Sequence, residues 1–391
     1  MSGDQPSAPE RDRRPCHTGA AGRLLPWLPF CLLLLWGWRA LDLVHTLPGT
    51  ADVLEVLWGV LWYRDALLSR GVSPLYYELI AHPHGWHPAT LAHTPFLFLM
   101  LLPLNEFAGP AFAYNAAAIL SLVAAFAGAR QLARRFPRGE FAATLVGLVF
   151  AFAGMRWFRV AQGHLNILWA SALLPWLLWA LEGARVSQSR AATRRWLGLS
   201  GLLWGLTICL SLYGVFLGAL CFLIWGRELF RWRCLGQAVL TGLVALGIGS
   251  PVLVLYWMGA RQDGVISLGL EHVVHWGASL NSLVVPNVDH PLPFVREVAR
   301  AIYAGPYDES GLSNLGPVTC VLGGLGLWRA VTRGAAQAGA EDGAHACRNL
   351  VWLTVGGLVL SCGLWLKWDG SLVGHPVFSP VNSAIWGIGR E

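Results

Sequence analysis

Long apolar stretches are the feature that most constrains how this chain can fold. The stretch from Trp196 to Trp225 is 30 residues long and contains no Asp, Glu, Lys or Arg. A helix that spans a bilayer needs about 20 mainly apolar residues. Charged residues make up 13% of the 391 residues, about half the usual share near 25%, so they are too few to cover a soluble surface. The sequence therefore predicts an all-α, polytopic helical membrane protein.

We expect about nine membrane-spanning helices. They cover roughly Leu24–Leu43, Gly109–Leu132, Ala142–Phe158, Ile167–Leu181, Trp196–Ser211, Tyr213–Trp225, Ala238–Met258, Leu315–Val331 and Leu350–Leu366. The stretch from Trp196 to Trp225 is interpreted as two short helices hinged near Ser211–Gly214. A single, strongly tilted helix is the alternative, and it would invert the topology of everything that follows.

The basic residues predict the orientation of these spans. Lys and Arg number 28, and most of them fall in segments that lie inside when the N-terminus is cytoplasmic, as the positive-inside rule requires. The same rule accounts for the net charge of +6, so this charge indicates membrane insertion and no nucleic-acid partner. The near-absence of Lys is typical of high-GC bacteria. We therefore expect a multi-pass protein of the bacterial inner (plasma) membrane.

The domain organisation predicted from these features is simple. Residues 1–22 are expected to form a disordered cytoplasmic N-terminus, and residues 23–391 a single polytopic membrane domain. Two outer loops are long, at about residues 44–108 and 259–314. Long loops with mixed polar and aromatic content are where functional residues usually lie, so the chemistry is expected to face outward.

The first outer loop offers a catalytic carboxylate. Asp52 and Glu55 begin a stretch in which apolar residues recur at helical spacing, which predicts an amphipathic helix in the membrane interface. Those apolar residues are Leu54, Trp58, Leu61 and Ala66. Asp52 has two interpretations. It can cap the helix, because Asp52 and Glu55 nearly match a capping box. It can also be a general base or metal ligand at the membrane surface. Both interpretations can hold together. A second interfacial helix is expected over Pro95–Leu104.

Polar residues in the rest of the outer loops are further candidates. The sequence HPHGWHP contains His82 and His84, which suit either a metal cluster or a proline- and glycine-rich turn that holds polar groups. The second outer loop supplies weaker candidates for substrate binding, Asp289, His290 and Glu309.

A third group of candidates lies at the short outer turn between the third and fourth spans. His164 and Asn166 are suited to substrate contact or proton transfer, or are satisfied interfacial polar groups. Arg156 and Arg159 lie outside against the positive-inside trend. They are suited to binding a phosphate, because arginine recognises anions with two nitrogens; snorkelling at the interface is the alternative.

These stretches resemble the GT-C superfamily of multi-pass glycosyltransferases, which use polyprenyl-phosphate-linked sugars, and in particular a set of bacterial GT-C-like membrane proteins. The matching stretches are GTADVLEVLWGVLWYRDALLSRGVSPL, HPHGW, GPAFAYNAAAILSLVAAFAGARQLARRF, FAFAGMRWFRVAQGHLNILWASALLPWLLWAL and SLNSLVVPNVDHPL. Together they cover most of the chain from about residue 45 to 320. The chain stops at SPVNSAIWGIGRE, where such proteins usually continue with further spans, so a C-terminal truncation is expected.

The resemblance implies roles for the candidates. Asp52 takes the place of the acid of the first outer loop, which serves as base or metal ligand, and a divalent cation (Mg or Mn) is the cofactor implied. Arg156 and Arg159 would bind the phosphate of the lipid donor. His164 and Asn166 stand where some members have a second acid, which is a departure from a mechanism with two carboxylates. The implied partners are a polyprenyl-phosphate sugar donor, a lipid or envelope-glycan acceptor, and membrane lipid. The alternative functions are a non-catalytic transporter or lipid-handling protein, or an inactive truncated remnant.

Overall fold

The structure is a computed structural model of the whole chain. It describes residues 24–38, 42–49, 52–77, 94–136, 139–227, 235–262, 281–285, 293–302, 317–333, 348–357, 367–368 and 371–372. The chain forms two compact units, Met1–Arg39 and Ala40–Glu391.

The first unit contains a 3-10 turn, η1 (Leu25–Trp27), followed by helix α2 (Leu28–Trp38). The sequence predicts a longer span that reaches Leu43, and this boundary is wrong. In the second unit, residues 42–46 form a turn in which the Asp42 carboxylate accepts a hydrogen bond from the Val44 N–H at 2.9 Å. An aspartate that satisfies the backbone of the following residues favours a turn over a helix.

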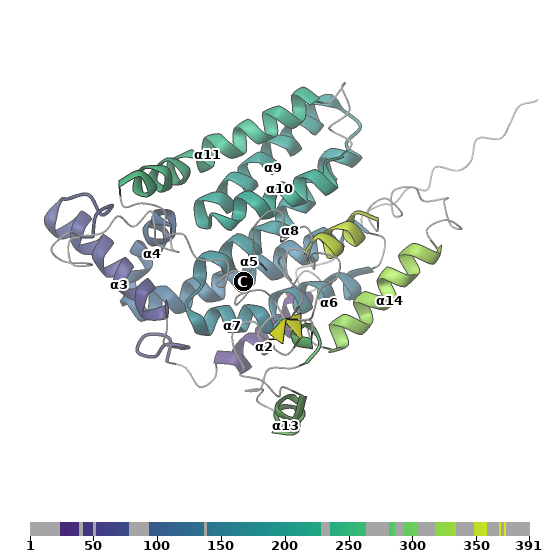
Figure 1. Cartoon of the computed structure of the whole chain (residues 1–391), viewed down its shortest axis with the longest axis horizontal. Helices are drawn as coiled ribbons and strands as arrows, with labels where there is room; N and C mark the ends of the chain where they lie inside the picture. Colours follow the sequence, from purple (N-terminus) through teal and green to yellow (C-terminus); the bar gives the residue numbers. More distant parts are fainter. Residues whose placement is uncertain are drawn as a thin grey trace, which may run out of the picture. The chain divides into compact units, whose positions relative to one another are not determined.

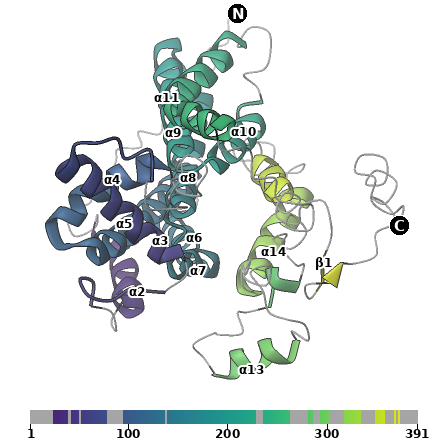
Figure 2. The ribbon, with the colours of Figure 1, turned by 60° about the vertical axis from the view of Figure 1, so that its left-hand side comes forward.

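The second unit is built around a row of long apolar helices. Helix α5 packs on α8, α8 packs on α9, and α9 packs on α11 (Figures 1 and 2). Their bounds are α5 Pro110–Ala133, α8 Leu165–Val186, α9 Arg190–Leu210 and α11 Leu235–Gln262. Each of the four contains a predicted span, with ends that extend a few residues beyond the prediction in most cases. The row forms the bundle against which the other described helices of this unit are arranged.

Glycines allow these helices to approach closely. A Cβ atom at Gly205 of α9 would lie 2.6 Å from the Ile248 side chain of α11. A Cβ atom at Gly218 would lie 2.1 Å from the Trp204 ring of α9. Small residues at helix contacts are typical of membrane proteins, where close van der Waals packing replaces the hydrophobic effect between helices.

The predicted hinge between two short helices is confirmed. Helix α9 ends at Leu210 and helix α10 covers Tyr213–Trp225, separated by Ser211 in an extended conformation. The Trp204 indole N–H donates to the Gly214 carbonyl at 3.1 Å, which ties the two helices together across the turn. The alternative of one tilted helix is therefore wrong.

The third predicted span is interrupted. Helix α6 (Gly139–Ala151) and helix α7 (Gly154–Gln162) are separated at Phe152–Ala153, although together they form a stretch long and apolar enough to cross a membrane. Helix α6 packs on α5, whereas α7 packs on α8 and on the helix of the first outer loop. The break thus turns the C-terminal end of this span toward the polar candidates.

Two helices of the predicted first outer loop pack against α5. Helix α3 (Asp52–Arg64) continues as a π-helical segment, η2 (Asp65–Arg70), and helix α4 covers Pro95–Ala108. Both predicted helices are confirmed, but the apolar stripe of α3 is not its buried face. Leu54 and Leu61 are exposed, and α3 instead buries the face that carries Val53, Val56, Val60 and Tyr63. A helix that is apolar on both sides suits contact with protein on one and lipid on the other.

The remaining described elements are short. They are 3-10 turn η5 (Asn281–Leu283), helix α13 (Pro293–Ile302), helix α14 (Pro317–Arg333), a helix at residues 348–357, and strands β1 (Lys367–Trp368) and β2 (Ser371–Leu372). The two strands pair antiparallel, with Lys367 opposite Leu372.

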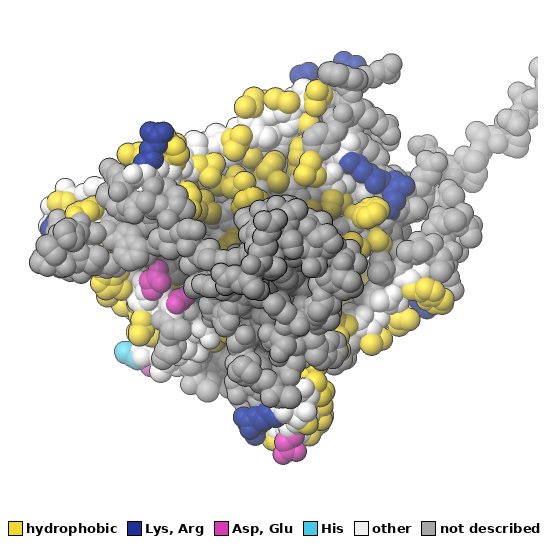
Figure 3. Space-filling model, viewed as in Figure 1, with side chains coloured by type: hydrophobic (Ala, Val, Ile, Leu, Met, Phe, Trp, Pro, Cys, Tyr) yellow, Lys and Arg dark blue, Asp and Glu magenta, His cyan; other side chains and the backbone are white. Residues whose placement is uncertain are grey.

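Four stretches of the described chain are long and apolar enough to cross a membrane: Pro110–Ala133, Gly139–Gln162, Leu165–Val186 and Leu235–Gly259. Helix α11 also exposes large apolar side chains such as Leu240, Leu243 and Leu246. Hydrophobic atoms gather on the face formed by α9, α10 and α11 (Figure 3). An exposed apolar surface of this kind is the surface that lipid covers. The chain is therefore an all-α, polytopic membrane protein, as predicted.

Candidate functional site

The candidate site lies where the start of α3 meets the turn between α7 and α8. Gly163, in that turn, has a φ of 90°, and a Cβ atom there would lie 2.2 Å from the Val53 nitrogen. Just before α3, a Cβ atom at Gly49 would lie 1.9 Å from the Ala161 carbonyl oxygen. Only glycine has no Cβ atom, so these two positions permit backbone contact that any other residue would prevent. This contact brings Asp52 beside His164.

Three side chains form a hydrogen-bonded row at this contact. His164 Nε2 lies 2.9 Å from Asp52 Oδ2, and Arg159 Nη1 contacts His164 Nδ1 on the other side of the ring. A guanidinium can only donate, so Nδ1 must accept and carries no proton. His164 is then neutral, and its Nε2–H donates to Asp52. The row therefore fixes both the tautomer of the imidazole and the orientation of the carboxylate.

The carboxylate at the end of the row remains accessible. The Asp52 side chain is 44% exposed, whereas that of His164 is 15% exposed. Oδ2 accepts from His164, and no described residue donates to Oδ1. Two helices, α3 and α8, begin at this point, and the positive ends of helix dipoles favour negative charge nearby. The arrangement can hold a carboxylate with one oxygen fixed and the other open to accept a proton.

Helix α5 supports the site with two polar side chains that the sequence analysis did not select. Tyr114 donates from its hydroxyl to the Val160 carbonyl of α7 at 2.6 Å. Asn115 donates to the carbonyls of Leu43 at 3.0 Å and Thr46 at 2.9 Å. Both side chains are buried. The signal that was available is the Tyr-Asn pair itself, which interrupts an otherwise apolar stretch. It marks a helix that anchors both the turn before α3 and helix α7.

Arg156 is placed differently from Arg159. Arg156 is 6% exposed. Its Nη1 donates to Ser171 Oγ at 2.7 Å and its Nη2 donates to the Leu168 carbonyl at 3.0 Å. Both terminal nitrogens are thus used to attach α7 to α8. Asn166, two residues after His164, is also buried on α8.

Glu55 lies one helical turn after Asp52 and faces a group of aromatic residues. Burial raises the pKa of Tyr77, and the charges of Tyr63 and Glu55 raise it further, which indicates that Glu55 is near this phenol. Burial alone raises the pKa of Tyr63. Trp58 packs edge-on against Tyr77, with 4.8 Å between ring centroids. Glu55 therefore borders the site on the side of this aromatic group.

Several predicted site residues are not part of the described structure. His82, His84, Asp289, His290 and Glu309 all lie outside the described residues. Within the described chain there is no group of three His, Cys, Asp or Glu side chains that could hold a metal ion. Asp52 and Glu55 are the nearby carboxylates there, and the guanidinium of Arg159 brings a positive charge to the same place. The described donors alone therefore do not form a divalent-cation site, and the predicted cation stays a prediction.

Two solved structures resemble this chain, and both are of ArnT from Cupriavidus metallidurans. The apo structure matches with a TM-score of 0.53 at 17% identity, covering 90% of this chain and 57% of that chain. The structure bound to undecaprenyl phosphate matches with a TM-score of 0.48 at 16% identity, covering 87% and 60%. This chain thus spans less than two thirds of the length of those ArnT chains. No protein-family model and no curated protein matches it.

ArnT is a GT-C glycosyltransferase. Its apo structure matches this chain over nine tenths of the chain's length. The chain therefore has a GT-C-like fold.

Proposed function

We propose that this protein is a membrane glycosyltransferase of the GT-C type. It transfers a sugar from a polyprenyl-phosphate carrier to a lipid or envelope-glycan acceptor on the outer face of the bacterial inner membrane, with its N-terminus in the cytoplasm. The observation that carries the proposal is the Asp52 carboxylate, which His164 orients through Oδ2 and whose side chain is 44% exposed. The GT-C-like fold supports the same class of reaction.

The reaction requires one bond to break and one to form. The bond between the anomeric carbon and the phosphate oxygen breaks, and a bond forms between that carbon and the acceptor oxygen or nitrogen. The acceptor proton goes to Oδ1 of Asp52, and the electron pair of the broken bond stays with the polyprenyl phosphate. A general base placed in this way contributes about 10²–10⁴-fold to the rate.

The negative charge that develops on the phosphate needs a positive partner. Arg159 is half-buried beside the Asp52–His164 pair, so it is the arginine that we assign to the departing phosphate. Preorganised positive groups in a low-dielectric site stabilise such charge strongly. Arg156 is assigned to fixing α7 on α8, because its two terminal nitrogens already have protein partners. No step in this scheme passes through a metal ion.

The proposal is tested by measuring whether the sugar donor accumulates when the protein is absent. The gene is deleted, and polyprenyl-phosphate sugars in total lipid extracts are measured by mass spectrometry, with a strain complemented by the wild-type gene as the control. One polyprenyl-phosphate sugar should accumulate on deletion and return to its normal level on complementation. If no lipid-linked sugar changes, the proposal is wrong.

The alternatives from the sequence are a non-catalytic transporter or lipid-handling protein and an inactive truncated remnant. A transport path is expected to carry ionisable side chains inside the spans. The described spans do bury Arg156 and Glu182, but each is bonded to neighbouring protein groups, Arg156 to Ser171 and Glu182 to Arg185 and Trp225. Nothing in the described residues therefore favours transport over transfer.

A further inference from the structure

The end of the bundle opposite the candidate site is rich in arginine. Helices α5 and α8 both begin near Asp52, at Pro110 and Leu165, and both end at turns that contain several arginines. At 1.5 Å per residue, the 24 residues of α5 extend about 36 Å, which is enough to cross a bilayer core of about 30 Å. The arginine-rich turns therefore lie at the other face of the membrane from Asp52.

Some of these arginines have acidic partners. Glu140 accepts from Arg130 at 2.8 Å and pairs with Arg134, also at 2.8 Å. Glu182, buried near the end of α8, accepts from Arg185 at 2.7 Å and from the Trp225 indole at 2.9 Å. Both carboxylates in the described part of this region are thus already neutralised.

Arg135 is held in a fixed position between two aromatic rings. Burial lowers the pKa of its guanidinium, and the nearby charge of Glu182 raises it. Its guanidinium carbon lies 5.2 Å from the centroid of Trp179 and 5.0 Å from the centroid of Trp196. The two rings pack edge to face at a centroid distance of 4.8 Å. Trp196 in turn covers Gly183, where a Cβ atom would lie 2.6 Å from the ring. An arginine held between two rings keeps its N–H groups available for an anion.

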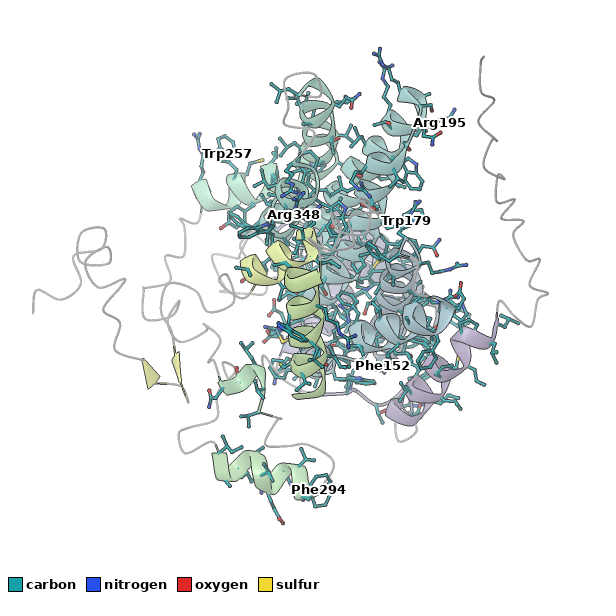
Figure 4. All side chains as sticks on the ribbon, turned by 90° about the vertical axis from the view of Figure 1, so that its right-hand side faces the viewer. Phe152, Trp179, Arg195, Trp257, Phe294 and Arg348 are labelled. Atoms are coloured by element: carbon teal, nitrogen blue, oxygen red, sulfur yellow. The ribbon has the colours of Figure 1, made fainter. Side chains whose placement is uncertain are left out.

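Three further arginines lie at the start of α9, and two of them directly precede Trp196. Arg190, Arg194 and Arg195 are exposed, and none of them pairs with an acid in the described part of the chain. Ser189 caps the N-terminus of α9, because its side chain accepts a hydrogen bond from the Ala192 N–H at 3.2 Å. Arg195 projects outward from the bundle, and Trp179 lies further in (Figure 4). The end of the bundle that carries Arg135, Trp179 and Trp196 therefore also carries the exposed arginines at the start of α9.

We propose that Arg135, Arg194 and Arg195, together with Trp179 and Trp196, bind the headgroup phosphate of an anionic phospholipid. Guanidinium groups match phosphate oxygens in geometry and charge. Tryptophans settle at the level of lipid headgroups, and basic pockets between membrane helices recognise anionic headgroups. We assign the site to a lipid of the leaflet next to these turns, because the apolar spans of α5 and α8 end there and offer a surface for its acyl chains. This site is separate from Asp52 and does not depend on the proposed reaction.

The test measures lipid binding by the full-length protein. Purified protein in nanodiscs is heated in phosphatidylcholine alone and with phosphatidylglycerol added, and retained lipid is counted by native mass spectrometry. Phosphatidylglycerol should raise the melting temperature of the wild type, and Arg135→Gln and Arg195→Gln should each weaken its binding by at least about tenfold, or roughly 1.4 kcal/mol. Arg195 is exposed, so its variant reports on binding even if Arg135→Gln fails to fold.

Arg261 provides a matched control. Its guanidinium carbon lies 4.0 Å from the Trp257 centroid at the far end of α11, so Arg261→Gln also removes a cation from a tryptophan. It should leave binding unchanged. The proposal is overturned if Arg195→Gln binds phosphatidylglycerol as the wild type does, if Arg261→Gln weakens binding equally, or if inorganic phosphate stabilises the protein as well as the lipid does.

Discussion

Replacing Gly163 with alanine tests the contact on which the whole site depends. Gly163 has a φ of 90°, and a Cβ atom there would lie 2.2 Å from the Val53 nitrogen and 2.3 Å from the Asp52 carbonyl carbon. The left-handed backbone alone costs a non-glycine residue about 1–2 kcal/mol. Normal contacts between such atoms are about 3.5 Å, so the start of α3 must also move by roughly 1 Å. A displacement of that size at a reacting group costs about 100-fold in rate.

Two other glycines separate these effects. Gly71 has a φ of 63° and nothing within 4 Å of a Cβ atom, so Gly71→Ala carries the backbone cost without the contact. A Cβ atom at Gly49 would lie 1.9 Å from the Ala161 carbonyl oxygen. Gly49→Ala therefore tests the backbone contact at a neighbouring point. In thermal unfolding in detergent, Gly163→Ala should lower the melting temperature more than Gly71→Ala does. Sugar transfer should fall in Gly163→Ala and Gly49→Ala but not in Gly71→Ala. If Gly163→Ala and Gly71→Ala behave alike in both assays, α3 does not rest on this turn.

Three other substitutions and conditions give expected outcomes. His164→Leu removes the group that orients Asp52 and should lower sugar transfer by roughly tenfold to hundredfold without loss of expression; unchanged transfer in a well-expressed variant would contradict the role of His164. Tyr114→Phe removes a buried hydrogen bond to Val160 and should cost about 1 kcal/mol of stability. Tyr77→Phe removes a buried hydroxyl that has no hydrogen-bond partner among the described residues and should cost nothing or stabilise. Equal losses of melting temperature would refute the role of the Tyr114 hydrogen bond. Burial raises the pKa of Tyr63 and of Tyr77, so the folded state keeps both phenols protonated while those of the unfolded chain ionise near pH 10. The stability of the fold should therefore decrease as the pH rises above about 10. In a series of melting temperatures at alkaline pH, Tyr63→Phe should show a smaller decrease than the wild type.

Much of the helical architecture follows from one-dimensional patterns. Apolar runs locate α5 and α11 to within a few residues, because lipid requires an uninterrupted helix of bilayer length. The hinge before Tyr213 is also predictable, since a serine and a glycine flank it. The break at Phe152–Ala153 is harder to predict, because Gly154 is the only local signal and a single glycine is tolerated inside a helix. It arises from the separate packing of α6 on α5 and of α7 on α8.

The candidate site is predictable only as a set of separate residues. Asp52 and His164 both stand out as polar groups at helix starts, but 112 positions separate them, and no spacing rule connects them. Their contact depends on Gly49 and Gly163, whose role is visible only once the two segments touch. Arg156 and Arg159 look equivalent in the sequence, three residues apart, yet one is bonded to α8 and the other to His164. The direction of each side chain on a short helix decides this difference.

The central claim is that Asp52 is the carboxylate that carries sugar transfer. The most direct measurement is a mass profile of surface glycans from the wild type, a deletion strain, and strains that carry Asp52→Asn or Asp65→Asn at matched expression. Asp65 is a suitable control because it is also half-exposed and lies just beyond the same helix, where it faces Arg70 at 3.9 Å. We expect the deletion and Asp52→Asn to lose the same sugar unit, while Asp65→Asn keeps the wild-type profile. A well-expressed Asp52→Asn strain with a complete profile would contradict the claim.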